Sequence, residues 1–274
     1  MSARVTLVMS VFNQLELTRA CLESLRVTTE PFRLVVIDNG STDGTREFFE
    51  RFPYPFPLDY DYYGVNTSVI ASLNRAWRRV ETEFLCLLHN DTEMLEPTWL
   101  ARLLSPFTAA HAGLTGLYGV KRVRRDGKYV GRTIVHSLAD GPTVRAPSEE
   151  VAVLDSVCLL LPRGLMEAVG GLDEGYGFYH CYDKDLSLAV RERGRRCYVV
   201  RAPFHHRGGG TRTSDFAKRR DVERRDLGDR RAANARFAAK FRHRLPCDVR
   251  PLGERLREWV SAKVTGGGRT GRDG

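Results

Sequence analysis

Short apolar runs alternate with amphipathic segments along the first 110 residues. The run at 4–10 (RVTLVMS) is rich in Val and Leu and predicts a buried strand. Leucines then recur at helical spacing over 14–25, and a second apolar run follows at 33–38 (RLVVID). The alternation continues with a helical segment at 67–80 and a third strand at 83–88 (EFLCLL). Strands separated by helices predict crossover units, and therefore a parallel sheet with helices on both faces.

The pattern changes after residue 110. Residues 114–136 alternate in pieces around Arg125-Asp126-Gly127, which predicts a hairpin turn. The apolar run at 151–161 predicts one further strand. The remaining expected elements are a helix over 163–169 that stops at Gly170-Gly171, a helix over 183–193 capped by Asp183, a strand over 197–200 and a helix over 214–244.

Composition and cysteine usage narrow the class of protein. The 274 residues are 42% hydrophobic and 28% charged, which is ordinary for a globular domain. No run approaches the ~20 apolar residues of a membrane-spanning helix, and the N-terminus has no secretory signal pattern. The six cysteines form no C-x-x-C pair, so we expect reduced core thiols in a cytoplasmic protein.

The basic charge is concentrated in the last quarter of the chain. Residues 201–274 hold 20 basic and 9 acidic residues, a net charge of +11, against −2 for residues 1–200. Such a region indicates a polyanionic partner or a solvated helix that aids solubility. We expect the basic side to face acidic lipid headgroups at the inner face of the membrane, or a phosphorylated acceptor. The apolar side would dock onto the domain through Phe216, Phe237, Ala238 and Phe241.

Polar groups follow three of the predicted parallel strands, at Ser10–Asn13, Asp38–Ser41 and His89–Asp91. Because ligands bind beyond the carboxyl ends of such strands, we expect one shared pocket. No glycine-rich phosphate loop follows the first strand, which argues against a nicotinamide dehydrogenase and against a P-loop enzyme. A carboxylate can instead hold a divalent cation against a diphosphate, and Asp91 is placed to do so.

Further carboxylates and histidines lie later in the chain. Asp183 and Asp185 begin a predicted helix, and His205-His206 precede a glycine run. These residues supply the ingredients of a metal-and-base site.

Taken together, the motifs resemble the inverting nucleotide-sugar glycosyltransferases of glycosyltransferase family 2, which have the GT-A fold. The resemblance covers roughly residues 4–211 and implies an α/β fold with a mixed, mostly parallel sheet flanked by helices. Six elements stand in the family's order: Phe12-Asn13, VIDNGSTD at 36–43, the spaced Asn66 and Asn74, LLHND at 87–91, GGLDE at 170–174 followed by DKDL at 183–186, and His206 with its following glycines.

The resemblance also implies roles for individual residues. Asp91 would coordinate Mg²⁺ or Mn²⁺, with His206 or its neighbour His205 as a further ligand, and Asp183 would be the general base. The reaction would move a sugar from a nucleoside diphosphate donor, UDP or dTDP, to a hydroxyl of a glycan, a lipid-linked acceptor or a small molecule, with inversion. The donor would be bound by Ser10, Phe12, Asp38, Asn66, Asn74 and Asn90.

Three departures from the family pattern leave alternatives open. Tyr182 stands where the family has Glu, His89 and Asn90 stand where a second carboxylate can occur, and Ser68 replaces a frequent Gly. One alternative is a catalytically inactive relative that only binds sugar nucleotide. Another is a polyanion-binding or nucleic-acid-binding protein led by the basic helix. That helix has few aromatics, so we expect no nucleic-acid partner.

The chain thus divides into three predicted parts. We expect a GT-A domain over 1–211, a basic helical extension over 212–264 and a disordered tail over 265–274.

Overall fold

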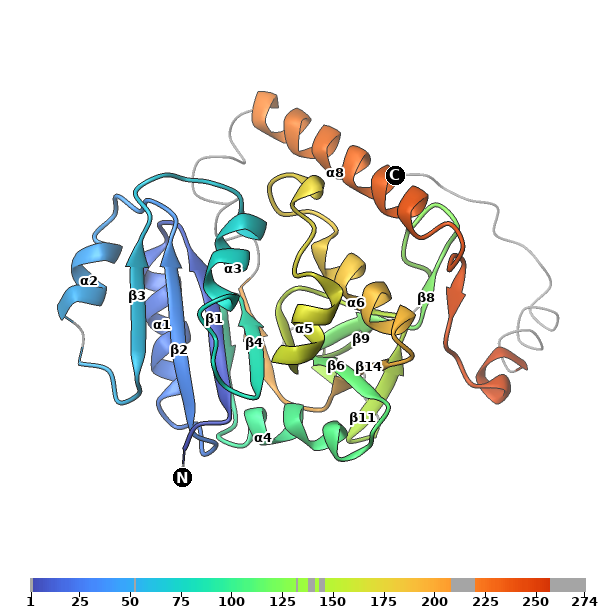
Figure 1. The fold of residues 1–274 in the computed structure, drawn as a ribbon, viewed down its shortest axis with the longest axis horizontal. Coiled ribbons are helices and arrows are strands. Elements are labelled where there is room, and N and C mark those ends of the chain that lie inside the picture. The colour runs from blue at the N-terminus through green and yellow to red at the C-terminus, as the bar shows by residue number, and fades with distance from the viewer. Residues whose placement is uncertain are drawn as a thin grey trace.

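Eight strands form the central sheet of the computed structural model (Figure 1). In spatial order they are β11 (Ser148–Val151), β14 (Arg196–Val200), β6 (Ala112–Gly116), β13 (Cys158–Pro162), β4 (Phe84–Leu88), β1 (Val5–Val11), β2 (Phe32–Asp38) and β3 (Leu58–Tyr62). The first four strands in sequence pair in parallel, as their alternation with helices predicts. β13 is antiparallel to β4 and to β6, so the sheet is mixed.

The structure describes residues 2–51, 53–131, 133–137, 141–142, 146–207 and 220–256. Two smaller sheets complete it. One has the order β12 (Val153–Leu154), β7 (Tyr118–Val120), β9 (Thr133–Ser137), β15 (Phe204–His206) and β5 (Thr92–Met94), with β10 (Gly141–Pro142) paired to β9. The other pairs β8 (Arg122–Val123) with β16 (Cys247–Asp248).

The prediction of one strand over 151–161 is wrong. The run is divided among the end of β11, β12 and β13. Asp155 and Ser156 interrupt it, and the Asp155 carboxylate accepts a hydrogen bond from the backbone of Val157 at 3.2 Å. A side chain that bonds the backbone two residues on favours a turn over a continuous strand.

Helices cover both faces of the sheet (Figure 1). Alternate residues of β1 point to opposite faces, so Leu7 and Met9 pack on one side with α1 while Val8 packs on the other with α3. Trp77 and Trp99 are buried in the two cores. The helices are α1 (Leu15–Leu25), α2 (Thr45–Arg51), α3 (Val69–Trp77), α4 (Trp99–Leu104), α5 (Arg163–Val169), α6 (Tyr182–Glu192) and α8 (Arg220–Lys240), with short 3-10 turns η1 (Ser105–Thr108) and η2 (Glu174–Tyr176).

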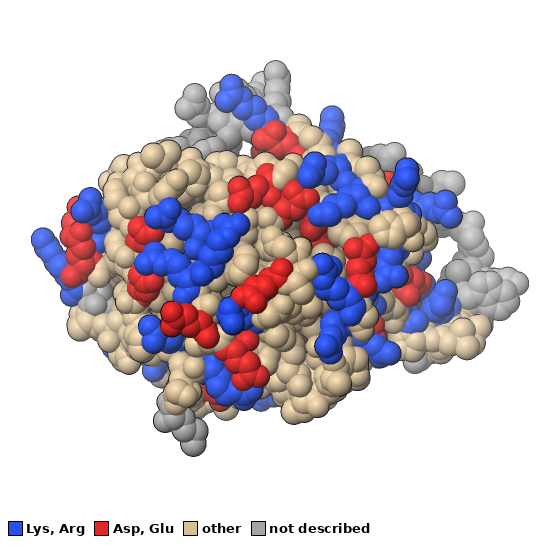
Figure 2. Space-filling model, viewed as in Figure 1, with Lys and Arg blue, Asp and Glu red and all other residues tan. Residues whose placement is uncertain are grey.

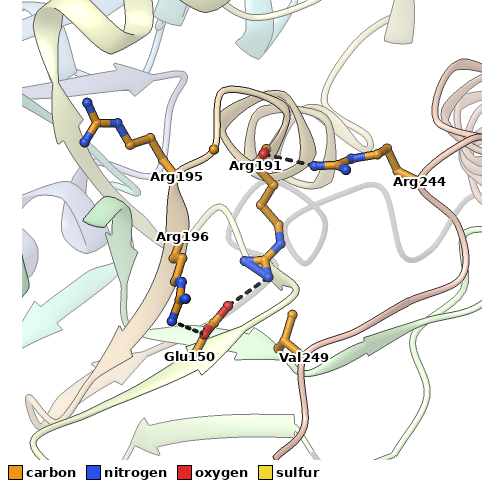
Figure 3. Close-up of a pocket in the computed structure, with 7 residues that line it drawn as sticks. Glu150, Arg191, Arg195, Arg196, Arg244 and Val249 are labelled. Carbon is orange, nitrogen blue, oxygen red and sulfur yellow. Dashed lines mark hydrogen bonds and ion pairs between the residues drawn. The ribbon is translucent and has the colours of Figure 1, made fainter. Parts of the chain in front are cut away.

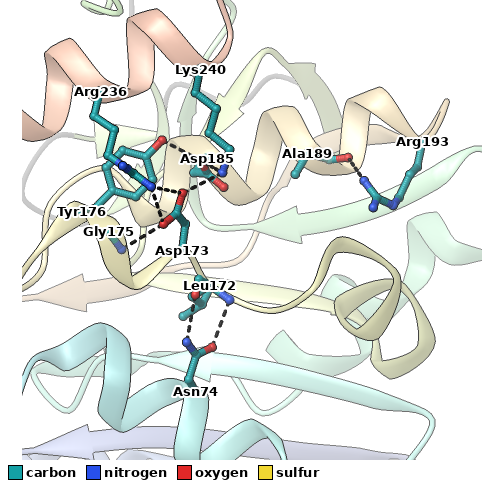
Figure 4. A network of polar contacts seen from close by, with 10 residues as sticks. All are labelled: Asn74, Leu172, Asp173, Gly175, Tyr176, Asp185, Ala189, Arg193, Arg236 and Lys240. Atoms are coloured by element: carbon teal, nitrogen blue, oxygen red, sulfur yellow. Dashed lines mark hydrogen bonds and ion pairs between the residues drawn. The ribbon is translucent and has the colours of Figure 1, made fainter.

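The basic helix α8 lies across the domain beside α6 (Figure 1). Phe237 of α8, and Phe241 just after its end, are buried in the same core cluster as Leu186 of α6, as the expected docking side requires. Ion pairs join the same surfaces. Lys240 Nζ lies 2.6 Å from Asp185 Oδ2 and 2.9 Å from Asp173 Oδ2 (Figure 4). Phe216 and the predicted tail at 265–274 lie outside the described residues.

Charged groups of both signs are interspersed over the face shown in Figure 2. Among the described residues, no helix combines the length and the apolar character needed to cross a membrane. All six cysteines are free thiols, and five of them are buried.

Candidate active site

The site lies at the point in the sheet where successive strands are added on opposite sides of β1. β2 lies on one side of β1 and is reached through α1, whereas β4 lies on the other side. In open α/β sheets, the crevice at such a switch point is where ligands bind. The segments that follow β1, β2 and β4 are the three polar segments that the sequence singled out.

Three side chains form a candidate metal centre beyond β4. His89, Asp91 and His206 each offer one ligand atom, and these atoms all lie within 4.8 Å of one another. His206 Nε2 is 3.1 Å from Asp91 Oδ1, and His89 Nδ1 is 3.9 Å from the same oxygen. β15 brings His206 there because it pairs antiparallel with β5, which places His206 opposite Thr92.

Asp91 has the burial and the neighbours of a metal ligand. It is 8% exposed. Although His206 Nε2 lies close by, Oδ1 is buried and makes no hydrogen bond of good geometry within the described part of the chain. A buried carboxylate oxygen without a partner is costly, and a bound cation would satisfy it. These residues therefore fit a divalent metal.

The two histidines differ in their electrostatics. Burial lowers the pKa of His89 below its ordinary value, so this ring is neutral at pH 7 and offers a nitrogen lone pair. Burial also disfavours the charged form of His206, but the adjacent Asp91 carboxylate outweighs it and raises the pKa of His206. The pKa of Asp91 is lowered, because the two imidazoles outweigh the effect of its burial.

His205 is not part of this cluster. It lies opposite Glu93 in the β15–β5 register, and successive strand residues point to opposite faces. Of the two histidines that the sequence offered, the structure brings His206 to Asp91. His89 joins it from the segment after β4.

Asp183 lies in the first turn of α6 and is buried. The expected cap at this residue is wrong, because the helix begins one residue earlier and its N-cap is Cys181, with φ 60° and no side-chain cap hydrogen bond. The backbone N–H of Lys184 donates to Asp183 Oδ1 at 2.8 Å. Burial, with the nearby Asp155 carboxylate adding to it, raises the pKa of Asp183 to about 7.

Asp155 is a site residue that the sequence reasoning missed. It follows β12, and its charge acts on Asp183, His89 and His206. Its charge therefore reaches both the candidate metal ligands and the candidate base. The one signal of this residue in the sequence is that it interrupts the apolar run at 151–161.

Four of the six predicted donor residues lie at the same strand ends, and several of the six make hydrogen bonds within the protein. Asp38 is fully buried and accepts hydrogen bonds from the Gly40 and Ser41 backbone and from the Tyr60 hydroxyl. Ser10 donates to Ser72 Oγ at 2.8 Å, and Phe12 is half-buried just after β1. Exposed Asn66 accepts from the Asn39 amide, and Asn90 donates to Thr18 Oγ1.

Asn74 binds the GGLDE segment to α3 rather than pointing into an open crevice. Its amide donates to the Leu172 carbonyl at 2.8 Å, as Figure 4 shows, and also to Glu174 Oε1 at 2.8 Å. Its carbonyl oxygen accepts from the Leu172 N–H at 3.0 Å and from Trp77 Nε1 at 2.8 Å.

The sequence profile of glycosyl transferase family 2 matches residues 6–168, which is more than half of the chain. The chain belongs to glycosyl transferase family 2. Among curated relatives, it is 25% identical to the O-antigen biosynthesis protein RfbC of Myxococcus xanthus over 237 residues. That match covers 76% of this chain and 18% of RfbC, so the chain spans about a fifth of that relative's length.

Solved structures show the fold of this family 2 protein. The mannosyltransferase PcManGT of Pyrobaculum calidifontis, in complex with GDP-Man and Mn²⁺, superposes with a TM-score of 0.55 at 17% identity, covering 96% of this chain and 80% of that one. S. aureus TarS 1–349 in complex with UDP-GlcNAc gives a TM-score of 0.56 at 17% identity, covering 94% of this chain and 79% of that one. The predicted GT-A fold, a mixed sheet flanked by helices, is confirmed.

Two departures from the family pattern now have local explanations. Ser68, where Gly is frequent in family 2, is the N-cap of α3 and accepts a hydrogen bond from the Ala71 N–H at 2.9 Å. An N-cap serine stabilises a helix by about 1 kcal/mol relative to alanine. Tyr182 replaces the family's Glu and contacts His89.

Proposed function

We propose that this family 2 protein transfers a sugar from a nucleoside diphosphate donor to a hydroxyl acceptor, with a divalent metal and with inversion. One observation carries the proposal. The candidate metal ligands His89, Asp91 and His206 lie near the start of α6, which carries the buried carboxylate Asp183, since Tyr182, the residue before Asp183, contacts His89. A metal site and a general base in one crevice are what displacement of a diphosphate by an alcohol requires.

His89, Asp91 and His206 would hold the metal. When bound, it would stabilise the negative charge that develops on the diphosphate leaving group. Two imidazole nitrogens and one carboxylate favour Mn²⁺ over Mg²⁺, because Mg²⁺ prefers oxygen ligands. A fold neighbour with GDP-Man and Mn²⁺ supports the same choice.

Asp183 would take the proton. Its carboxylate accepts the proton of the acceptor hydroxyl while that oxygen attacks the anomeric carbon from the face opposite the leaving group. The bond between the anomeric carbon and the diphosphate oxygen breaks, and its electron pair leaves with the diphosphate. In-line attack inverts the anomeric configuration. A pKa of about 7 places the base near the working pH, where proton transfer is most efficient.

The donor would lie along the ends of β1, β2 and β4. Asp38 holds the Gly40–Ser41 turn in place, and the donor is bound by that turn together with Ser10, Phe12, Asn66 and Asn90. UDP or dTDP remains the predicted nucleotide, and the acceptor is a hydroxyl of a glycan, a lipid-linked molecule or a small molecule. The free thiols support a cytoplasmic location.

A titration of the purified chain tests the proposal. UDP-, dTDP- and GDP-sugars are titrated into the chain, and their binding is measured by calorimetry in the presence of Mn²⁺, of Mg²⁺ or of a chelator. The anomeric configuration of any transfer product is determined by NMR. We expect Mn²⁺-dependent binding of one donor class and an inverted product. Donor binding without hydrolysis or transfer would indicate an inactive relative. A chain that binds polyanions with steep salt dependence but no sugar nucleotide would contradict the proposal.

A further inference from the structure

A second pocket lies at the opposite end of α6 from Asp183. It has a volume of about 380 Å³ and is formed by β11, the end of α6, the start of β14 and the segment after α8 (Figure 3). The proposed transfer reaction uses none of it. We call it the arginine pocket, and it is lined by Glu150, Arg191, Gly194, Arg195, Arg196, Arg244 and Val249.

Positive charge exceeds negative charge in the arginine pocket. Four arginines line it against one carboxylate, Glu150, although the Arg195 guanidinium turns away from Glu150 and donates to the Ala110 carbonyl. Arg191 Nη2 lies 2.9 Å from Glu150 Oε1, and Arg196 Nη1 lies 3.4 Å from Glu150 Oε2. Two guanidinium groups therefore share a single carboxylate, as Figure 3 shows.

One guanidinium nitrogen in this pocket lacks an oxygen acceptor. The side chain of Arg191 is 14% exposed, and its Nη1 is buried without a hydrogen-bond partner among the described residues. The group lies beside the thiols of Cys197 and Cys247, which are weak acceptors. A buried N–H of a charged group is expensive to leave unpaired, and a bound anion is one way to satisfy it.

The C-terminal end of α6 repels an anion less strongly here than a helix end whose carbonyl groups have no donors beside them. Carbonyls at the end of a helix carry partial negative charge. In this pocket Arg244 Nη2 donates to the Arg191 carbonyl at 3.0 Å, and outside it Arg193 Nη1 donates to the Ala189 carbonyl of the same helix end at 3.3 Å. The last turn therefore presents guanidinium groups in addition to its carbonyl oxygens.

We propose that the arginine pocket binds a phosphate group carried by another molecule, either a phosphorylated solute or a lipid headgroup. A carboxylate is satisfied by one guanidinium fork, whereas a phosphate monoester carries close to two negative charges and three strong acceptor oxygens. Arg191, Arg196 and Arg244 offer donors from three separate segments, which matches that demand.

Phosphate binding is tested with the full chain in a buffer that contains a chelator. The chelator ensures that no metal ion bridges phosphate to His89, Asp91 and His206. Inorganic phosphate and glucose 6-phosphate are titrated by calorimetry. Phosphatidylcholine vesicles with and without phosphatidic acid are tested by flotation. We expect Arg196→Gln and Arg244→Gln each to weaken binding by about tenfold or more, because each removes a charged donor. Arg46→Gln, which removes an exposed arginine ion-paired with Glu50 on α2, is the matched control and should change nothing.

Glu150→Gln should change the affinity for phosphate in the opposite direction from the arginine variants. It removes the competing carboxylate, so phosphate should bind more tightly even if the variant is less stable. Binding of the soluble phosphates alone identifies a solute, and selective flotation with phosphatidic acid identifies a headgroup. The proposal is overturned if the wild-type chain binds none of these, or if Arg196→Gln, Arg244→Gln and Arg46→Gln bind alike. No metal or sugar nucleotide is present, so this outcome is independent of the transferase proposal.

Discussion

The hydroxyl of Tyr182 lies 3.4 Å from Nε2 of His89. The other ring nitrogen, Nδ1, faces Asp91 Oδ1 at 3.9 Å. A metal-binding histidine commonly uses its second nitrogen to hold an orienting partner, and that partner tunes the site. Tyr182 is 2% exposed and immediately precedes Asp183 at the start of α6. One helix end therefore carries the proposed base and orients a proposed metal ligand.

Replacing Tyr182 by Phe removes this partner and keeps the buried ring. We expect Mn²⁺ affinity to fall by about 10–100-fold, the usual effect of losing an outer partner of a metal ligand. Calorimetry with Mn²⁺ measures it. Tyr176→Phe is the matched control, because that phenol is buried nearby but donates to Asp185 at 2.7 Å. Equal affinities for the two variants would show that the Tyr182 hydroxyl does not position His89, whereas absence of Mn²⁺ binding to the wild type would count against the metal site itself.

His206 and His205 provide a neighbouring pair with opposite expectations. His206→Ala removes a proposed ligand, so the loss of Mn²⁺ affinity should exceed that of Tyr182→Phe. His205→Ala should leave the affinity unchanged, because His205 lies outside the cluster. The same calorimetric titration distinguishes them. A larger loss in His205→Ala would mean that the strand register places the other imidazole at the metal.

Much of this architecture could be predicted from local patterns. The apolar runs at 33–38 and 83–88 match β2 and β4 closely, and 163–169 matches α5. Those segments are stabilised by interactions that the sequence displays directly, namely burial on a regular period and a glycine stop.

The site was harder to predict because it depends on contacts between distant segments. Choosing His206 over His205 requires the register of β15 against β5, and a shift of one residue would exchange the two. His89 becomes a candidate ligand only because β15 lies beside the segment after β4, more than 100 residues away in sequence. Asp155 reads as an ordinary turn residue until α6 is packed next to it.

The raised pKa of Asp183 predicts the pH dependence of transfer. Only the ionised carboxylate accepts a proton, so the turnover rate should rise as pH increases through about 7. Asp155→Asn removes a repelling charge and should lower the pKa of Asp183, which moves this limb of the profile to lower pH. Initial rates of transfer measured across the pH range check both. An unshifted pH profile in Asp155→Asn would show that burial alone raises the pKa of Asp183.

Asp183→Asn should separate donor binding from turnover and also stabilise the fold. Without the base, transfer should fall by about 10²–10⁴-fold while Mn²⁺-dependent donor binding persists.

The pKa of Asp183 is raised in the folded state, so stability is lost as pH rises towards 7 and the buried group ionises. The neutral amide avoids that cost, so the unfolding temperature at pH 8 should exceed that of the wild type. Wild-type turnover in Asp183→Asn would refute the assignment of the base.

Lys240 stabilises the end of α8 against the start of α6. It bridges Asp173 and the buried Asp185, while Arg236 pairs only with Asp173 (Figure 4). Lys240→Met leaves Asp185 with the Tyr176 hydroxyl as its side-chain hydrogen-bond partner in the described part of the chain. Breaking a fully buried pair costs about 3–5 kcal/mol, and since Lys240 is 40% exposed we expect about 1–3 kcal/mol in urea unfolding. Asp185→Asn in the Lys240→Met background should recover part of that loss, because the carboxylate no longer needs a counter-charge. Fully additive losses would show that the two residues contribute independently.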